Sequence, residues 1–458
     1  LWCLVHRMGD RVAGTANDKR TIFGWAMYDW ANSAYITIAG AVIAPFFTGG
    51  IVPEDGYSVF GVQMSGETLW ATVVSIGALV LFLAMPVLGA IADFSGAKRK
   101  FLRAFAVTGG VVMILMTLIP NGSVAFFLGA FLITNLAFVA ANVMYDGLLV
   151  DITTDETIDT VSSKGYAYGY VGGGLYLLLA LQLITLSEGA GSVTGLETDT
   201  AVRIAIAGAG VWWIAFTWFA LGRMQIHEAA TAVGDGTWKD YARVGFSRTL
   251  SIGKQLTKMR HLMLFVIAFM LFNDGTQTVI NISGAYARET LNLELKTIAT
   301  AFLIVQFIAF VGALAFGALA NRIGPKNAIL VSLVGWSFIT IGGFSLPEGD
   351  ATAFLALAAT IGLVLGGTQA LSRSLYGTMI PEEASAEFFG FFSVFSKFSA
   401  IFGPLIFAIV SFQTGSGRPA ILSILFFFVA GGILLSRVDI DAARESRSAF
   451  DLEHTTKM

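Results

Sequence analysis

Carboxylate and amide side chains interrupt stretches of this sequence that are otherwise apolar. The segment YDWANSAY at residues 28–35 places Asp29 and Asn32 between IFGWAM and ITIAGAVIAPFF. A charge at the centre of a bilayer costs about 2.5–3.5 kcal/mol on insertion scales, so such residues are expected to face a partner or a water-filled cavity. Groups that can bind a proton, a cation or a polar solute therefore occupy positions where apolar residues are the norm.

A second apolar stretch carries a polar stripe. Its segment FNDGTQTVINIS contains four carboxylate or amide residues: Asn273, Asp274, Gln277 and Asn281. Positions 274, 277 and 281 recur every three to four residues, which places their side chains on one face of a helix. A single polar residue in such a stretch is typical of a hydrogen bond between helices, worth about 0.6 kcal/mol. A continuous stripe instead favours a cavity.

Two further stretches carry opposite charges at matching positions. The polar residues of ANVMYDGLL and GGTQALSRSLY are Asn142, Tyr145, Asp146, Gln369 and Arg373. The two amides, and likewise Asp146 and Arg373, are 227 positions apart, so they are expected at equivalent depths of two related helices. We predict that Asp146 and Arg373 form a gate at one end of the cavity. Another cation, Lys397, lies about ten residues inside an apolar stretch and is expected at the cavity.

The composition is that of an integral membrane protein. Of 458 residues, 55% are hydrophobic and 13% charged, and the mean hydropathy is +0.74. Twelve apolar runs of about 20 residues or more, enough to cross a bilayer as a helix, lie near 22–48, 68–92, 101–119, 124–150, 165–187, 201–222, 261–285, 296–320, 326–346, 351–376, 387–412 and 417–437. None alternates at period two as the strands of a membrane β-barrel do. We predict an all-α protein with twelve transmembrane helices.

The positions of Lys and Arg predict the orientation. With both termini in the cytosol, 22 of the 28 basic residues fall in cytosolic tails and loops, in agreement with the positive-inside rule. The six others are Arg203, Arg288, Lys296, Arg373, Lys397 and Arg418. The predicted organisation is a cytosolic tail at 1–21, a six-helix half at 22–222, a cytosolic linker at 223–260, a second six-helix half at 261–437 and a cytosolic tail at 438–458.

A loop motif occurs once in each predicted half. GAIADFSGAKRK at 89–100 follows the second span, and GALANRIGPKN at 317–327 follows the eighth. The residues that match at a constant offset of 228 are Gly89, Asp93, Gly96 and Lys98 with Gly317, Asn321, Gly324 and Lys326. One copy alone is typical of a charged hairpin. Two copies at equivalent places predict pseudo-symmetric halves, the architecture of many secondary transporters, whose substrate site lies between the repeats.

Other classes of function have little support in the sequence. The four histidines lie in tails or at the edges of spans, and the single cysteine is Cys3, so neither a metal site nor a disulfide is expected. The net charge of −3 does not favour a nucleic-acid partner. No nucleophile stands with a His and an Asp at workable spacing. We therefore expect no cofactor and no enzymatic activity.

The motifs resemble those of a known family. The predicted halves and GAIADFSGAKRK look like the major facilitator superfamily. YDWANSAY, FNDGTQTVI, GGTQALSRSLYGTMIP and EFFGFFSVFSKFSAIFGPL are similar to segments of autophagy-related vacuolar amino-acid effluxers and their bacterial relatives. This resemblance covers nearly the whole membrane region. It implies a cavity lined by spans 1, 4, 7 and 10, alternating access, amino-acid export in fungal members, and here a multi-pass protein of a bacterial inner (plasma) membrane.

Two residues depart from the pattern of that family. An amide is expected more often than an acid after Tyr145, so Asp146 departs from it. Asn321 replaces the acid of the second loop copy. Only the first copy, with Asp93, Lys98 and Arg99, is therefore expected to act as a charged conformational latch.

Two functions remain open from the sequence. One is a monomeric secondary transporter in which Asp29 and Asp274 present carboxylates to a small polar solute such as an amino acid, with a proton as coupling ion. The other is a membrane receptor that binds a solute without moving it. Matched halves favour the transporter, because a receptor has no need of them. Membrane lipids are the other expected partners.

Overall fold

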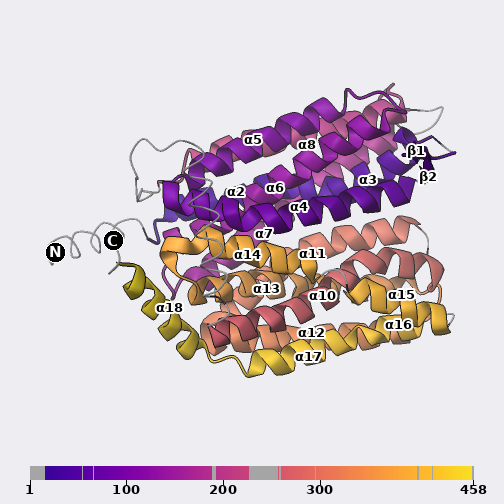
Figure 1. Cartoon of the computed structure of the whole chain (residues 1–458). Helices are drawn as coiled ribbons and strands as arrows, with labels where there is room; N and C mark the ends of the chain where they lie inside the picture. Colours follow the sequence, from indigo (N-terminus) through magenta and orange to yellow (C-terminus); the bar gives the residue numbers. More distant parts are fainter. Residues whose placement is uncertain are drawn as a thin grey trace.

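The computed structural model describes residues 16–455, apart from 54, 65, 188–191, 226–255, 257–258, 294, 400–401 and 415. Its helices run side by side in two layers, one from each half of the chain, with α7 between them (Figure 1). The hairpin β1–β2 lies at one end of the bundle, and α18 lies at the other. We call these the hairpin end and the tail end.

The described residues of the first half form ten elements. They are α2 (Lys19–Ile38), η1 (Ala39–Ile43), α3 (Ala44–Phe46), η2 (Phe47–Ile51), β1 (Tyr57–Val59), β2 (Val62–Met64), α4 (Gly66–Ser95), α5 (Lys98–Met116), α6 (Val124–Ile152), α7 (Ile158–Leu186) and α8 (Thr198–Leu221), counting the hairpin as one. The first predicted span is therefore one long helix with two π-helical segments near its hairpin end.

The second half continues in the same manner. Its elements are α10 (Arg260–Glu289), α11 (Leu295–Ile323), α12 (Pro325–Ser345), α13 (Ala351–Met379), η3 (Glu382–Ala384), α14 (Ser385–Phe398), α15 (Phe402–Thr414), α16 (Gly417–Ser423), α17 (Leu425–Ser436) and α18 (Ile440–Thr455). Across the middle of the molecule, α14 packs on α4 and α6, while α11 and α13 pack on α7.

Nine helices among the described residues are long and apolar enough to cross a membrane. The three other predicted spans, 68–92, 101–119 and 387–412, coincide with α4, with α5 and with the pair α14–α15. The count of twelve spans and the N-in/C-in orientation stay predictions. Of the predicted cytosolic segments, most of 1–21 and of the linker 223–260 lies outside the described residues, and the tail 438–458 contains α18.

One element was not expected from the sequence. Strands β1 and β2 pair antiparallel across Phe60 and Gly61, both of which have positive φ. Such a two-residue turn matches the twist of a hairpin, but it places a bulky side chain where Asn or Gly is usual. The hairpin lies in the loop after the first span, outside the helical bundle.

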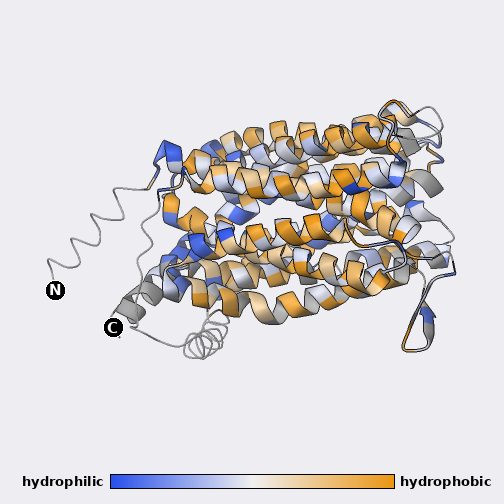
Figure 2. Ribbon diagram, turned by 90° about the horizontal axis from the view of Figure 1, so that it is seen from above, coloured by the Kyte–Doolittle hydropathy of each residue, from blue (hydrophilic) through white to orange (hydrophobic). Residues whose placement is uncertain are grey.

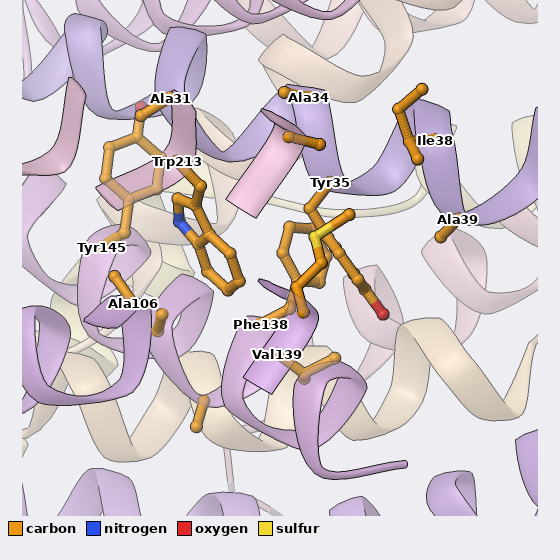
Figure 3. Close-up of a cluster of buried hydrophobic side chains, with 14 of the residues drawn as sticks. Ala31, Ala34, Tyr35, Ile38, Ala39, Ala106, Phe138, Val139, Tyr145 and Trp213 are labelled. Carbon is orange, nitrogen blue, oxygen red and sulfur yellow. The ribbon is translucent and has the colours of Figure 1, made fainter. Parts of the chain in front are cut away.

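Each half has its own aromatic and aliphatic core. In the first half, Tyr35 of α2, Phe138 of α6 and Trp213 of α8 are buried against one another, with ring centroids 4.7 to 5.9 Å apart (Figure 3). In the second half, Trp336 of α12 stacks on Phe428 of α17 at 5.4 Å. Each half is therefore packed around a core of its own.

Hydrophilic residues concentrate at the tail end, and apolar residues cover the length of the bundle (Figure 2). At the tail end the described chain begins, with the Asn17 backbone N–H donating to the Ile152 carbonyl at the end of α6. Arg447 of α18 lies at the same end, on the Thr378 carbonyl. The predicted orientation makes this the cytosolic side.

Candidate functional site

A cavity of about 190 Å³ lies between the two halves. It is bounded by helices α2, α6 and α7 of the first half and by α11 and α13 of the second. Its lining residues are Asp29, Asn32, Ser33, Ile36, Thr37, Phe138, Asn142, Tyr145, Asp146, Tyr166, Gly169, Tyr170, Gln306, Gln369 and Arg373. Two carboxylates, one guanidinium and several amides and phenols therefore share a small space deep in a membrane protein.

Asp29 lies halfway along α2 and is 9% exposed. Its Oδ2 accepts a hydrogen bond from the Tyr145 hydroxyl at 2.8 Å and lies 3.4 Å from Nη1 of Arg373. The Tyr145 ring stacks on Trp25 at 4.3 Å, and the Trp25 indole N–H donates to the Tyr145 carbonyl. The tyrosine is thus fixed at both ends, and it directs its hydroxyl at the carboxylate.

Arg373 joins the two halves at this level. It is 3% exposed on α13 and reaches across to α6 and α7. Nη1 lies 3.2 Å from Asp146 Oδ1, Nε donates to the Ser162 hydroxyl at 3.0 Å, and Nη2 donates to the Ser162 carbonyl at 2.9 Å. Removing one partner of such a buried pair leaves an uncompensated charge, which is strongly unfavourable. The predicted contact between Asp146 and Arg373 is present in the structure, and Asp29 contacts the same nitrogen of Arg373.

Two hydrogen-bonded pairs, each with at least one amide side chain, line another part of the cavity. The Asn32 side chain donates to Asn142 Oδ1 at 2.6 Å within the first half. Across the halves, the Tyr170 hydroxyl donates to Gln369 Oε1 at 2.6 Å. Amides and hydroxyls can both donate and accept, so this part of the wall can bind polar groups of either kind.

Gly165 of α7 makes room for the charged cluster. A Cβ at this position would lie 2.9 Å from Arg373 Nη2 and 2.8 Å from the Tyr145 hydroxyl. Real Cβ atoms do not approach polar atoms so closely without displacement of the neighbour. A glycine therefore lets α7 approach the guanidinium closely without displacing it.

The first copy of the loop motif joins the two halves at the tail end. Lys98 Nζ lies 3.0 Å from Asp93 Oδ1 and 2.9 Å from Asp151 Oδ2, and it donates to the Ser385 hydroxyl at 2.6 Å. The Asp93 carboxylate also accepts the backbone N–H groups of Ala386 and Glu387 at the start of α14. A carboxylate is favourable at a helix N-terminus, where N–H groups lack partners. Residues of one half thus hold the first turn of a helix of the other.

The second copy of the loop motif also contacts the other half, but through uncharged groups. Asn321 of α11 exchanges hydrogen bonds with the Thr160 hydroxyl of α7, and Lys326 donates to the Val438 carbonyl within its own half. In the first copy, Arg99 donates to the Leu221 carbonyl at the end of α8, in its own half. Within this first copy, Asp93 and Lys98 make charged contacts with the start of α14 in the other half.

α18 adds an ionic clasp at the tail end. Arg447 Nη1 lies 3.1 Å from Asp155 Oδ1 in the loop between α6 and α7, and its Nη2 lies 2.7 Å from Glu382 Oε1. Arg444 Nε is 3.8 Å from Asp155 Oδ2. One C-terminal helix therefore binds acidic residues of both halves.

Replacing Arg447 by Gln is expected to loosen this clasp. Each ion pair near the surface contributes up to about 1 kcal/mol and Arg447 makes two, so tail-end opening should rise no more than about 30-fold. The reporter is a cysteine in place of Ser374, which is buried and faces Asp159 across the halves, in a Cys3→Ala background. Its rate of thiol labelling should increase in Arg447→Gln and stay unchanged in the exposed control Arg437→Gln. Equal rates in both variants and the parent would contradict the clasp.

The polar stripe of α10 is not among the residues that line this cavity. Asn273 donates to the Ser396 carbonyl of α14 and to the hydroxyl of Ser399, which follows α14. Asp274 Oδ1 accepts the Gly403 N–H of α15 at 2.9 Å. Gln277 is half-buried, and Asn281 is exposed on the part of α10 toward the hairpin end. Lys397 belongs to α14, and its side chain lies outside the described residues. A role of these five residues in solute binding stays a prediction.

Asp274 is accordingly expected to matter for stability more than for binding. Asp274→Val should lower the free energy of unfolding by about 1–2 kcal/mol, because the Gly403 N–H loses its acceptor inside the membrane. Asp274→Asn keeps an acceptor and should stay close to the parent. Thermal unfolding in detergent measures both. Equal melting temperatures for Asp274→Val and the parent would contradict this role.

Several lining residues were missed by reading the sequence. Tyr166 and Tyr170 lie one turn apart on α7, and Gln306 lies on α11. The tyrosines carried a signal, since their spacing of four places them on one helix face with Ser162. The sequence around Gln306 gave no indication of a cavity, because an isolated amide in an apolar stretch is typical of a contact between helices.

The cavity between two similar halves can be compared with known proteins. A family model described as "Vacuole effluxer Atg22 like" matches residues 17–448. The chain belongs to this family. A similar curated protein is the uncharacterized MFS-type transporter YxiO of Bacillus subtilis, 28% identical over 90% of this chain and 94% of that protein. Autophagy-related protein 22-1 of Phaeosphaeria nodorum is 22% identical over 96% of this chain and 94% of its own length.

Solved structures show the same fold. The MFS transporter FucP in its outward conformation has a TM-score of 0.67 over 92% of this chain and 98% of its own, at 11% identity. The proton:xylose symporter XylE has a TM-score of 0.65 over 92% of this chain and 94% of its own, at 14% identity. This member of the Atg22-like family is therefore a multi-pass membrane transporter with the major facilitator fold.

Proposed function

We propose that this Atg22-like transporter moves a small polar solute, an amino acid, across a bacterial plasma membrane by alternating access. The observation that carries the proposal is the bridge at the cavity, where Arg373 of the second half contacts Asp29 and Asp146 of the first. A solute bound there touches both halves, so its binding can change how they fit together. The cavity lies within one chain, which is consistent with a monomer as the working unit.

Contacts between the halves at the tail end support a conformation that is closed on that side. From the cavity to the tail end, the halves are joined by the Ser162 hydroxyl on the Ala370 carbonyl, by Asn321 with Thr160, by Asp93 and Lys98 with the start of α14, and by α18. Transport would require these contacts to break while the halves rock about the cavity. The loop motif and the clasp then act as a latch for one of two states.

A proton is the coupling ion that suits this site. Protonation of Asp29 or Asp146 would remove one of the two negative charges that hold Arg373, and the bridge between the halves would weaken. The chain then has a way to link proton binding to release of the tail end. Uptake driven by an imposed pH gradient, and its loss in Asp29→Asn, would test this coupling.

Counterflow in proteoliposomes tests the transporter directly. Vesicles loaded with one unlabelled amino acid at a time should accumulate the labelled form transiently when they contain the parent protein. Asp29→Asn should lose most of this signal, and Glu156→Gln, an exposed acid in the loop before α7, should keep it. Protection from thermal unfolding by an amino acid without counterflow would instead identify a receptor.

A further inference from the structure

The guanidinium of Arg373 occupies a cage that is built for a cation. Its central carbon lies 4.2 Å from the Tyr166 ring centroid, 4.9 Å from that of Trp25 and 5.4 Å from that of Tyr145. The faces of aromatic rings attract cations within about 6 Å, most strongly where water is excluded. Asp29 and Asp146 complete the cage on the side of the cavity.

The contacts of Arg373 with the two carboxylates are loose. Both go to the same nitrogen, Nη1, at 3.4 and 3.2 Å. Charge-assisted hydrogen bonds of this kind are usually about 2.7–2.9 Å long. The firm contacts of Arg373 are those of Nε and Nη2 with Ser162. Nη1 thus makes long contacts with both carboxylates, while Nε and Nη2 are hydrogen-bonded to Ser162.

Among the described residues, the cavity lining has more negative than positive groups. It contains two carboxylates and one guanidinium, and its other described polar groups are neutral. A solute with one positive charge would therefore balance this described lining, whereas an anion would meet two carboxylates beside one described cation. Arg373 itself offers little to an incoming carboxylate, because Nε and Nη2 are engaged by Ser162 and Nη1 lies between the acids.

We propose that the solute is recognised by a cationic group, an ammonium or guanidinium, which takes the place of Arg373 Nη1 between Asp29 and Asp146. This inference rests on the proposed function and specifies the chemical class of its solute. Ser162 and Tyr166 then retain Arg373, which is buried and needs partners. A carboxylate on the solute is tolerated at the amide wall but is not required.

Displacement of Arg373 links binding to opening. Arg373 belongs to the second half and both acids belong to the first, so a solute cation that takes the acids removes two charge contacts between the halves. A neutral or anionic molecule of the same shape cannot take them over. In this proposal the Arg373 guanidinium occupies the position that the cationic group of the solute takes. Replacement of the guanidinium by the solute cation then releases the contacts at the tail end.

The first test asks whether the cage binds a free cation once Arg373 is shortened. Methylguanidinium chloride should raise the melting temperature of Arg373→Ala by about 2 °C or more in a saturable manner. Methylurea, its neutral isostere, and sodium chloride should not. The double variant Arg373→Ala, Asp146→Asn and the exposed control Arg437→Ala should respond far less. A response to methylurea equal to that to methylguanidinium, or no response specific to Arg373→Ala, would overturn the proposal.

The second test uses the intact cage, so it does not depend on the folding of Arg373→Ala. Methylguanidinium should accelerate labelling of the Ser374→Cys reporter in otherwise unaltered protein, and methylurea should leave it unchanged. Absence of acceleration at concentrations that saturate the first test would overturn the link between cation binding and opening. Both tests measure cation binding or tail-end opening and do not depend on solute transport. A positive result with no counterflow of any amine or amino acid would therefore refute the proposed transport and keep the cation site.

Discussion

Replacing Arg373 by Ala is expected to reduce solute exchange by at least about 100-fold. Breaking a buried ion pair by removing one partner costs about 3–5 kcal/mol, and here two carboxylates lose their shared cation. The free energy of unfolding should fall by a similar amount. Counterflow in proteoliposomes and thermal unfolding in detergent measure the two effects.

A matched variant separates charge balance from the loss of a side chain. Arg373→Ala, Asp146→Asn removes one charge of each sign, so it should unfold at a higher temperature than Arg373→Ala while its exchange stays low. Arg437→Ala removes an exposed arginine from the end of α17 and should behave as the parent. Exchange by Arg373→Ala within about threefold of the parent would show that the bridge is dispensable.

Gly89→Val is expected to stop exchange by a different route. A Cβ at Gly89 of α4 would lie 2.7 Å from the Ala386 carbonyl carbon and 2.7 Å from the Glu387 Cα. Both are backbone atoms of the other half, so neither can move aside cheaply. The tail end should therefore fail to close, and the Ser374→Cys reporter should be labelled at least about tenfold faster than in the parent.

Gly129→Val is the matched control for this steric block. Gly129 lies on α6, and a Cβ there would meet nothing within 4 Å. This variant should exchange solute and label as the parent does. Normal exchange in Gly89→Val, or faster labelling in both glycine variants, would contradict a close approach of α4 and α14 as the seal.

Much of the fold could be predicted because lipid imposes a simple rule. A segment that crosses the hydrocarbon core must satisfy its own backbone, so long apolar runs such as 124–150 and 351–376 become helices. Their observed counterparts, Val124–Ile152 and Ala351–Met379, extend by one turn or less at either end. The hairpin at Phe60 was not predicted, because its formation does not depend on hydropathy.

The cavity could be predicted in part, and the reason lies in helix periodicity. Charge and spacing singled out Asp29, Asp146 and Arg373, which the structure brings together. The same reasoning placed Asp274 at the cavity by analogy with Asp29, but the structure directs Asp274 at α15. A stripe on one helix face indicates that the face is buried, and it does not reveal which neighbour buries it. That depends on how the halves pack.

The central claim is that Asp146 and Arg373 form a bridge between the two halves. Swapping their charges tests it most directly. Counterflow would be measured for the parent, for Asp146→Arg, for Arg373→Asp and for the double variant that carries both changes. If the two side chains act as a pair across the halves, each single change abolishes exchange and the double variant restores a measurable part of it. A double variant with no more exchange than either single variant would contradict the bridge between the halves.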